Sequence, residues 1–324
     1  MRGTDNQLKI ITIALIAVSF VTFDLYVYCN ITRRLINPFS ETMQAKSIEL
    51  EHFLPFDENS RIVKVVAPED YRFADDETLP VLDGATALFP VYSALFNAMY
   101  PEGSCDFVNG DFTEASLLQK RNTAGAFKAI VESKADIVFC AEPSQKQLEY
   151  AHENGVELTM VPIGYEAFVF LVNQANPVLS LTVDEVKKIF SGQISNWSKV
   201  QGDNSKIAPI IRAEGSGSQT AMINFMQGEK LLDKSNMFGG RSIGYSFRYY
   251  VQDIVSNSNI KMLALNGVAP TKENIQNKTY PVVANFYAIY RTSDARRKDI
   301  QKVINFVLSP LGQNIIEETG YVGL

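Results

Sequence analysis

Short apolar runs alternate with amphipathic segments from Arg61 onward, and this alternation predicts an α/β fold. Runs with the length and composition of β-strands cover residues 61–66, 136–141, 158–163, 167–172, 207–211 and 282–290. The chain has 324 residues, of which 46% are hydrophobic, so it can form one large or two medium domains with a buried core.

Between the predicted strands, apolar residues recur at three- and four-residue spacings, as on the buried face of a helix. The clearest such segment covers residues 87–99. A second segment begins with the capping box formed by Thr182 and Glu185 and stops at Gly192. A third, at the C-terminus, is interrupted at Pro310, because proline cannot continue a helix.

A long apolar segment lies at the N-terminus. It begins at Ile10 and, apart from Asp24, continues to Tyr28, which is enough to cross a bilayer, since a span requires about 20 residues. No small-residue cleavage site follows it. We therefore expect residues 1–30 to form an uncleaved membrane-spanning helix, with a cleaved signal peptide as the alternative. Residues 31–60 are expected to form a juxtamembrane tether.

The charge of the chain limits its partners. The formal net charge is −6 and the isoelectric point is near 5.2, with no long basic block. This balance argues against binding to nucleic acid, which depends on clustered lysine and arginine. Any bound anion must be held by local hydrogen-bond donors, because the overall field of the protein does not attract it.

The three cysteines are Cys29, Cys105 and Cys140, and none of them belongs to a C-x-x-C pair. Their spacing excludes zinc-finger and thioredoxin-type sites. Only Cys105 and Cys140 lie within the predicted domain, where they could form a disulfide. The favoured alternative is that Cys140 is a buried thiol in an apolar strand.

Few side chains suit catalysis or metal binding. His52 and His152 are the only histidines, so a Ser-His-Asp triad is not supported. The chain contains no P-loop, dinucleotide fingerprint or G-x-S-x-G nucleophile elbow, and no cluster of metal ligands. We therefore expect no enzyme activity, no catalytic residue, no cofactor and no metal ion.

Three segments place a hydroxyl residue and a small residue where a predicted helix begins: residues 84–87, 123–125 and 216–218. Taken alone, a serine or threonine at such a place is usually an ordinary N-cap. The start of a helix also carries unpaired N–H groups and a partial positive charge, which together bind phosphate-like anions. Three such starts in one domain, with the bidentate side chain of Arg212 close to the third, favour a shared anion site.

Residues 212–220, with the sequence RAEGSGSQT, closely resemble the corresponding segment in the phosphate-binding proteins of phosphate ABC transporters. Further segments that fit this family are residues 83–86, 168–173, 189–192 and 319–322. The resemblance extends over roughly residues 79–324, and the segment that begins at Arg212 is its most specific part.

The resemblance implies a two-lobed periplasmic-binding-protein fold, in which two α/β lobes are joined by two crossing hinge strands and close over a ligand. The crossings would lie near residues 161–170 and 280–290. Residues 61–165 and 284–324 would then form lobe 1, and residues 166–283 would form lobe 2.

The resemblance also implies which residues of lobe 1 bind phosphate. Thr86 would donate its hydroxyl and Ala87 its backbone N–H. Thr123 and Gly125 stand where the family has a Ser-Gly contact with the ligand. Both sets lie at the helix starts that the residue pattern singles out.

In lobe 2, the resemblance makes Arg212 the source of a charged guanidinium. Ser216, Gly217 and Ser218 would supply hydroxyl and backbone N–H donors. Glu214 matches the acidic residue that orients the arginine in this family.

One position departs from the family pattern. The family has an aspartate that accepts a hydrogen bond from protonated phosphate, but this chain has Ala141 there, followed by Glu142. We predict that the longer side chain of Glu142 takes the place of that aspartate and contributes to phosphate binding. The alternative is that Glu142 is a solvated loop residue.

The implied function is that of an extracytoplasmic receptor, held at the cell membrane by its N-terminal helix. It would bind inorganic phosphate and deliver it to the permease subunits of an ABC importer. The alternative is a membrane-tethered sensor of a related oxyanion, without a role in transport. An enzyme such as a phosphate-ester hydrolase is the least supported alternative, because the chain lacks a catalytic triad and a metal cluster.

Overall fold

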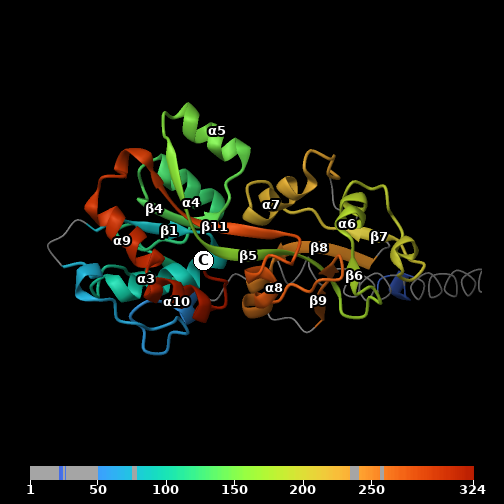
Figure 1. Cartoon of the computed structure of the whole chain (residues 1–324), viewed down its shortest axis with the longest axis horizontal. Helices are drawn as coiled ribbons and strands as arrows, with labels where there is room; N and C mark the ends of the chain where they lie inside the picture. The colour runs from blue at the N-terminus through green and yellow to red at the C-terminus, as the bar shows by residue number, and fades with distance from the viewer. Residues whose placement is uncertain (1–21, 25, 27–49, 75–78, 234–240, 256–258) are drawn as a thin grey trace, which may run out of the picture.

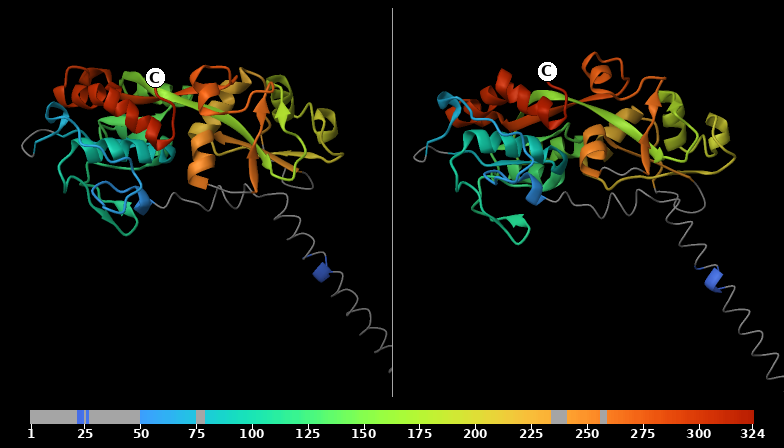
Figure 2. Two further views of the ribbon diagram at one scale, coloured as in Figure 1. Left: turned by 60° about the horizontal axis from the view of Figure 1, so that its bottom comes forward. Right: turned by 90° about the horizontal axis from the view of Figure 1, so that it is seen from below.

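Two long strands, β5 (Leu158–Asn173) and β11 (Val283–Arg291), run side by side through the middle of the molecule and connect its two lobes (Figure 1). The computed structural model describes residues 22–24, 26, 50–74, 79–233, 241–255 and 259–324. In both views of Figure 2, β5 extends from one lobe into the other. The alternation of strands and helices confirms the predicted α/β class.

The central sheet has the strand order β1-β4-β11-β5-β8-β7, and β9 also pairs with β5. The strands besides β5 and β11 are β1 (Leu82–Gly84), β4 (Ile137–Ala141), β7 (Ile207–Pro209), β8 (Arg241–Phe247) and β9 (Ile260–Met262). The β1–β4 and β7–β8 pairs are parallel, and the other pairs in this sheet are antiparallel. Both lobes therefore share one continuous sheet.

Strand β5 changes partner where the lobes meet. Its first part pairs with β11 as far as Ala167, and from Phe168 it pairs with β8. The register with β11 shifts between Phe286 and Tyr287. Gly164 faces this irregularity, and a Cβ there would lie 2.5 Å from the Phe286 ring. The sequence predicted two separate strands because the less apolar residues between 163 and 167 interrupt the pattern, but the backbone continues through them.

In lobe 1, helices cover both faces of the sheet. In Figure 1, α4 (Asn122–Val131) and α5 (Gln145–Glu153) lie above the sheet, and α3 (Phe89–Met99) and α10 (Pro310–Thr319) lie below it. α9 (Lys298–Leu308) packs in the same core as α3 and α10. Strand β4 is apolar on both sides as a result, because alternate residues face different helices.

Lobe 2 has its own core around the second half of β5. The helices α6 (Val183–Phe190), α7 (Gly217–Met226) and α8 (Lys272–Gln276) belong to it. The buried rings of Phe168, Phe170 and Trp197 pack in this core. Among the described residues, none belongs to both cores, so each lobe is stabilised largely by its own burial of apolar surface.

Shorter elements complete the fold. The strands are β2 (Phe107–Val108), β3 (Asp111–Phe112), β6 (Ser180–Leu181) and β10 (Ala264–Leu265). The 3-10 segments are Leu50–Phe53, Glu69–Tyr71, Thr86–Leu88, Trp197–Val200 and Thr292–Asp294, and Tyr250–Val255 is a π-helix.

The C-terminal segment is a third connection at the junction, beyond the two crossing strands that the sequence implied. Tyr321 packs in the core of lobe 1, whereas Val322 packs in the core of lobe 2. The N–H of Tyr165, in β5, donates to the carbonyl of Val322 at 2.7 Å. The last residues of the chain therefore contact both lobes where β5 passes between them.

Most of the helices that the sequence predicted are confirmed. The segment at 87–99 corresponds to a 3-10 turn followed by α3. Both hydrogen bonds of the Thr182–Glu185 capping box form at the start of α6. The C-terminal segment divides at Ser309 and Pro310 into α9 and α10.

Two predictions near residue 60 are wrong. Residues 61–66 are not a strand; this segment is irregular, and Val66 is 79% exposed. The tether expected at 31–60 does not extend to its end, because Leu50 and Phe53 are buried in the core of lobe 1. Pro55 is also buried.

The N-terminal predictions lie mostly outside the described residues. Of the predicted membrane helix at 1–30 the structure describes residues 22–24 and 26, and it does not describe residues 31–49. Within the described part of the chain, no helix combines the length and the apolar character that a bilayer span requires.

Cys105 and Cys140 are free thiols, so the disulfide alternative is wrong and the buried-thiol alternative is confirmed for Cys140. Cys140 lies in β4 with no exposed surface. Burial, with a smaller contribution from the charge of Asp83, raises the pKa of the Cys140 thiol to about 12. Cys29 lies outside the described residues.

The close packing of β1 on β4 gives a testable prediction. A Cβ at Gly84 would lie 2.4 Å from the carbonyl oxygen of Phe139, a backbone atom that cannot move aside easily. We expect Gly84→Ala to lower the free energy of unfolding by about 1–3 kcal/mol, as overpacked substitutions do. Denaturant titration measures this change.

Gly217→Ala is the matched control, because its Cβ would lie 3.4 Å from the Thr123 hydroxyl, an ordinary contact. We expect it to change the free energy of unfolding by no more than about 0.5 kcal/mol. Equal losses of stability in the two variants would show that the β1–β4 contact is not what requires glycine at position 84.

Candidate functional site

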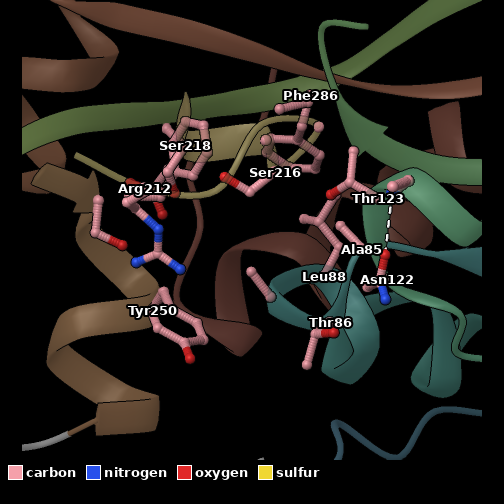
Figure 3. Close-up of a pocket in the computed structure, with 18 of the residues that line it drawn as sticks. Ala85, Thr86, Leu88, Asn122, Thr123, Arg212, Ser216, Ser218, Tyr250 and Phe286 are labelled. Carbon is pink, nitrogen blue, oxygen red and sulfur yellow. Dashed lines mark hydrogen bonds between the residues drawn. The ribbon is translucent and has the colours of Figure 1, made fainter. Parts of the chain in front are cut away.

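A cavity of about 510 Å³ lies between the lobes and is lined by residues from both (Figure 3). The structure brings together eight of the ten residues that the sequence singled out: Thr86, Ala87, Thr123, Arg212, Glu214, Ser216, Gly217 and Ser218. Gly125 and Glu142 do not line this cavity. His152, on α5, and His52 are exposed and lie elsewhere.

The first helix start is held by backbone contacts. The N–H of Ala85 donates to the carbonyl of Phe139 at 2.8 Å, which fixes the chain as it leaves β1. No side chain caps the turn at Thr86–Leu88. The hydroxyl of Tyr321 donates to the carbonyl of Ala87 at 2.7 Å. The side chain of Thr86 lies in the lower part of the cavity in Figure 3.

A buried carboxylate connects the first helix start to the second. Asp83 accepts the N–H of Gly84 at 2.8 Å, the N–H of Arg121 at 2.9 Å and the Arg121 guanidinium at 2.7 Å. Burial raises the pKa of Asp83, and the bonds from Arg121 oppose this rise. Because Arg121 directly precedes α4, this network holds the starts of α3 and α4 side by side.

At the second helix start, the side chain of Asn122 accepts hydrogen bonds from the first turn of α4. Asn122 has a left-handed φ of 59°, and its side-chain oxygen accepts the N–H of Ala124 at 3.1 Å and of Gly125 at 3.2 Å. Figure 3 shows this arrangement, with the Thr123 side chain directed into the cavity.

Gly125, which the resemblance implied as a phosphate contact, does not line the cavity. Its N–H is already bonded to Asn122, and it lies one turn inside α4 rather than on the cavity wall. A Cβ at this position would lie 2.8 Å from the Cβ of Arg121. Glycine is explained here by the packing of Arg121 against the helix.

At the third helix start, Ser216 is the N-cap of α7. Its hydroxyl accepts the N–H of Gln219 at 3.2 Å and donates to the carbonyl of Ala213 at 2.9 Å. Gly215 precedes it with a φ of 80°, a conformation that strains other residues. Gly217 and Ser218 follow in the first turn of α7, at the positive end of the helix dipole.

Arg212 is positioned by its own backbone. Its N–H donates to the hydroxyl of Tyr245 at 3.0 Å and to the side-chain oxygen of Gln219 at 3.2 Å. Burial raises the pKa of Tyr245 to about 12, so this phenol stays protonated. In Figure 3 the guanidinium lies between Ser218 and the ring of Tyr250.

Glu214 does not orient Arg212 as the resemblance implied. Its exposed carboxylate forms an ion pair with Lys146, on α5 of lobe 1. The carboxylate is directed out of the cavity wall toward the other lobe, and the Tyr245–Gln219 pair holds the arginine backbone in its place.

Glu142 lies on the wall of a neighbouring cavity of about 370 Å³, and its carboxylate accepts a hydrogen bond from Asn224 at 3.2 Å. Ala141, one residue earlier, lines both this cavity and the main one. In this structure the Glu142 carboxylate lies beside the main cavity rather than on its wall. The role of Glu142 in place of the family's aspartate stays a prediction.

Sequence reasoning missed Glu166, which lines the cavity from β5 and is 3% exposed. Its carboxylate accepts the N–H of Ala167 at 2.8 Å, the N–H of Tyr249 at 3.0 Å and the guanidinium of Arg248 at 3.3 Å. Burial raises the pKa of Glu166 to about 7 against the opposing charge of Arg248. A charged residue between two apolar strand runs was the available signal.

Two more residues on the cavity wall were missed. Lys120 is half-buried and adds a second cationic side chain on the lobe 1 side. Tyr250 begins the π-helix below Arg212. Burial raises the pKa of Tyr250, and the charge of Arg212 acts in the opposite direction.

The arrangement suits an anion. It combines the positive ends of α4 and α7, the guanidinium of Arg212 and the hydroxyls of Thr86, Thr123 and Ser218. Among the described residues, no group of three or more histidine, cysteine, aspartate or glutamate side chains is placed to hold a metal ion. The donors come from both lobes, so a bound anion would connect them.

Comparison with known proteins agrees with the fold. The model of a family described as the PBP superfamily domain matches residues 82–310. Protein SphX of Synechococcus elongatus is 26% identical over 283 residues, which cover 76% of this chain and 84% of that protein. The phosphate-binding protein PstS of Borreliella burgdorferi is 27% identical over 192 residues, or 53% of this chain and 67% of that protein.

Solved structures show the same fold. A substrate-binding protein from Clostridium perfringens with bound phosphate has a TM-score of 0.58 at 22% identity, over 76% of this chain and 100% of its own. An ABC-type phosphate transport receptor from Vibrio cholerae has a TM-score of 0.53 at 19% identity, over 75% and 99%. At these identities the likeness establishes the two-lobed architecture.

The buried Glu166 predicts a pH dependence of stability. Its pKa rises from 4.5 in the unfolded chain to about 7 in the folded protein, so the folded protein retains a proton that the unfolded chain loses. Its contribution to stability is complete below pH 4.5 and is lost as the pH rises to about 7. At about 1.4 kcal/mol per pKa unit, the loss is about 3–4 kcal/mol.

Glu166→Gln cannot titrate, so we expect it to remove this decline in the free energy of unfolding between pH 4.5 and pH 7.5. Denaturant unfolding at the two pH values measures it. Glu153→Gln, an exposed glutamate on α5, is the matched control and should keep the wild-type decline. If Glu166→Gln declines as steeply as the wild type, the raised pKa is refuted.

Proposed function

This chain belongs to the PBP superfamily, and from that membership we propose that it is an extracytoplasmic receptor that binds one inorganic phosphate ion between its lobes. The observation that carries the proposal is the convergence of three helix starts and Arg212 on one cavity. The phosphate-binding name of the Borreliella relative and the phosphate in the Clostridium structure support phosphate among the oxyanions.

Each lobe supplies part of the proposed ligand set. From lobe 1 come the hydroxyls of Thr86 and Thr123 and the N–H of Ala87. From lobe 2 come two charge-assisted bonds of the Arg212 guanidinium and the donors of Ser216, Gly217 and Ser218 at the start of α7. The hydroxyl of Ser216 already donates to Ala213, so its main role is to hold the turn.

The division of the chain supports a closing motion. We propose residues 61–165 and 284–324 as lobe 1 and residues 166–283 as lobe 2, with the boundary two residues before β5 changes its partner strand from β11 to β8. The irregular register at Phe286 and Tyr287 places a deformable point of the backbone at this boundary. Rotation there would bring the two sets of donors onto the ion.

Transport is the proposed physiological role. The receptor would deliver phosphate to the permease subunits of an ABC importer, as the name of the Vibrio transport receptor suggests for a protein of this fold. We further propose that residues 1–30 remain attached as a membrane anchor, since they contain an apolar run of bilayer length.

Calorimetry of the full-length chain in detergent tests binding. We expect one phosphate per chain, and we expect Arg212→Ala to weaken it far more than Thr123→Ala. Two lost charge-assisted bonds at about 1.5–3 kcal/mol each correspond to about two to four decades of affinity. One neutral bond, worth about 1 kcal/mol, corresponds to about a fivefold change.

Arg241→Ala is the control for the loss of a charge in lobe 2, because Arg241 pairs with Asp203 outside the cavity. Its affinity for phosphate should match that of the wild type. Absence of phosphate heat at millimolar ligand would refute the proposed function, and comparable losses in the Arg212 and Thr123 variants would refute the assigned roles.

The anchor has a separate test. We expect mass spectrometry of the protein extracted from membranes to find peptides that precede Cys29, because no small-residue cleavage site follows the apolar run. Peptides from the lobes serve as the internal reference for recovery. A mature chain that starts at or after Cys29 would contradict the anchor.

A further inference from the structure

The two lobes touch beside the cavity through four polar side chains. Lys146, on α5, forms an ion pair with Glu214, in the loop before α7. The amide of Asn224, on α7, donates to the carboxylate of Glu142, just after β4, at 3.2 Å. Each pair joins a residue of lobe 1 to a residue of lobe 2, and we refer to the two pairs together as the interlobe contact.

Small residues let the backbones approach next to these pairs. A Cβ at Gly217 would lie 3.4 Å from the Thr123 hydroxyl and 3.9 Å from the Cβ of Ala141. A Cβ at Gly215 would lie 3.6 Å from the Cβ of Ala124. The starts of α4 and α7 therefore meet closely, and the interlobe contact lies next to this meeting point.

We propose that the interlobe contact stabilises the closed arrangement of the lobes and thereby slows the release of the bound anion. Lys146 and Asn224 are then positioning residues, because they act by holding the two sets of donors together. This inference rests on the proposed binding of phosphate in the cavity.

The charges support a role in closure. Lys146 and Glu214 carry opposite charges at neutral pH, and the bond from Glu214 raises the pKa of Lys146 further. Lys146 does not line the cavity, so its removal leaves the donors to the anion intact. Release requires the lobes to separate first, so a contact present only between closed lobes acts on the dissociation rate.

Both partners are exposed, so the expected effect is modest and depends on salt. We expect Lys146→Glu in the full-length chain to release phosphate about two to five times faster, the range that exposed ion pairs give. The preference for phosphate over sulfate should stay unchanged. High salt should shrink the difference between the variant and the wild type.

Two further variants isolate the contact. The double variant Lys146→Glu with Glu214→Lys restores an ion pair of reversed polarity. It should release phosphate more slowly than expected from combining the changes in release rate that the two single variants show. Lys128→Glu is the matched control, because Lys128 is an exposed lysine of lobe 1 that pairs with Glu132, directly after α4 in the same lobe. Its release rate should equal that of the wild type.

A distance measurement separates this inference from the proposed function. Spin labels at Lys199→Cys in lobe 2 and Lys298→Cys in lobe 1, both exposed positions, report the separation of the lobes without any ligand, with the native cysteines replaced by alanine. We expect Lys146→Glu to widen the distance distribution and the double variant to narrow it again.

The two ideas then fail in different ways. If the wild type binds no phosphate but the distances change as expected, the interlobe contact stands and the ligand assignment is refuted. If phosphate binds and Lys146→Glu matches Lys128→Glu in both release rate and distance distribution, the interlobe contact is refuted and the proposed function stands.

Discussion

The convergence of helix starts on one cavity is the constraint on which the rest of the structure depends. Each start presents unpaired N–H groups and a partial positive charge, and bringing several together is unfavourable unless an anion lies between them. The fold achieves this with networks inside each lobe. The buried carboxylate of Asp83 holds the starts of α3 and α4 together through Arg121, and Tyr245 with Gln219 fixes the backbone of Arg212. These networks fix the positions of the donors within each lobe. The relative orientation of the two lobes is determined by the strands and the C-terminal segment at their junction.

Local patterns predicted the regular elements well. The capping box of α6 and the break at Pro310 depend only on neighbouring residues, so the sequence contains what is needed to place them. The errors come from tertiary packing. Residues 61–66 have the composition of a strand but find no partner strand, and Leu50 belongs to a segment that looked like a linker yet packs in a core. The sequence divided strand β5 in two because Glu166 interrupts the apolar pattern of the strand. Glu166 can be buried because Arg248 donates to it, but Arg248 lies 82 residues away in the sequence.

The candidate site was predictable as a set of helix starts but not in the direction of individual side chains. Thr123 faces the cavity because Asn122, which no pattern distinguished, takes the N–H groups of α4. The family resemblance assigned Glu142 and Glu214 to the site, and both carboxylates pair across the lobes. Glu214 lines the main cavity, whereas Glu142 lies beside it. In an extended segment, a shift of one residue moves a side chain to the opposite face. Whether a particular carboxylate enters the site therefore depends on the folded backbone.

The central claim is that one oxyanion is held by donors from both lobes at once. A crystal structure of the full-length chain grown with phosphate tests this most directly. The account predicts one tetrahedral ion between the Arg212 guanidinium and the starts of α4 and α7, with hydrogen bonds from Thr86 or Thr123 on one side and from Ser218 on the other. An ion bound by residues of a single lobe, or in the neighbouring cavity beside Glu142, would contradict it.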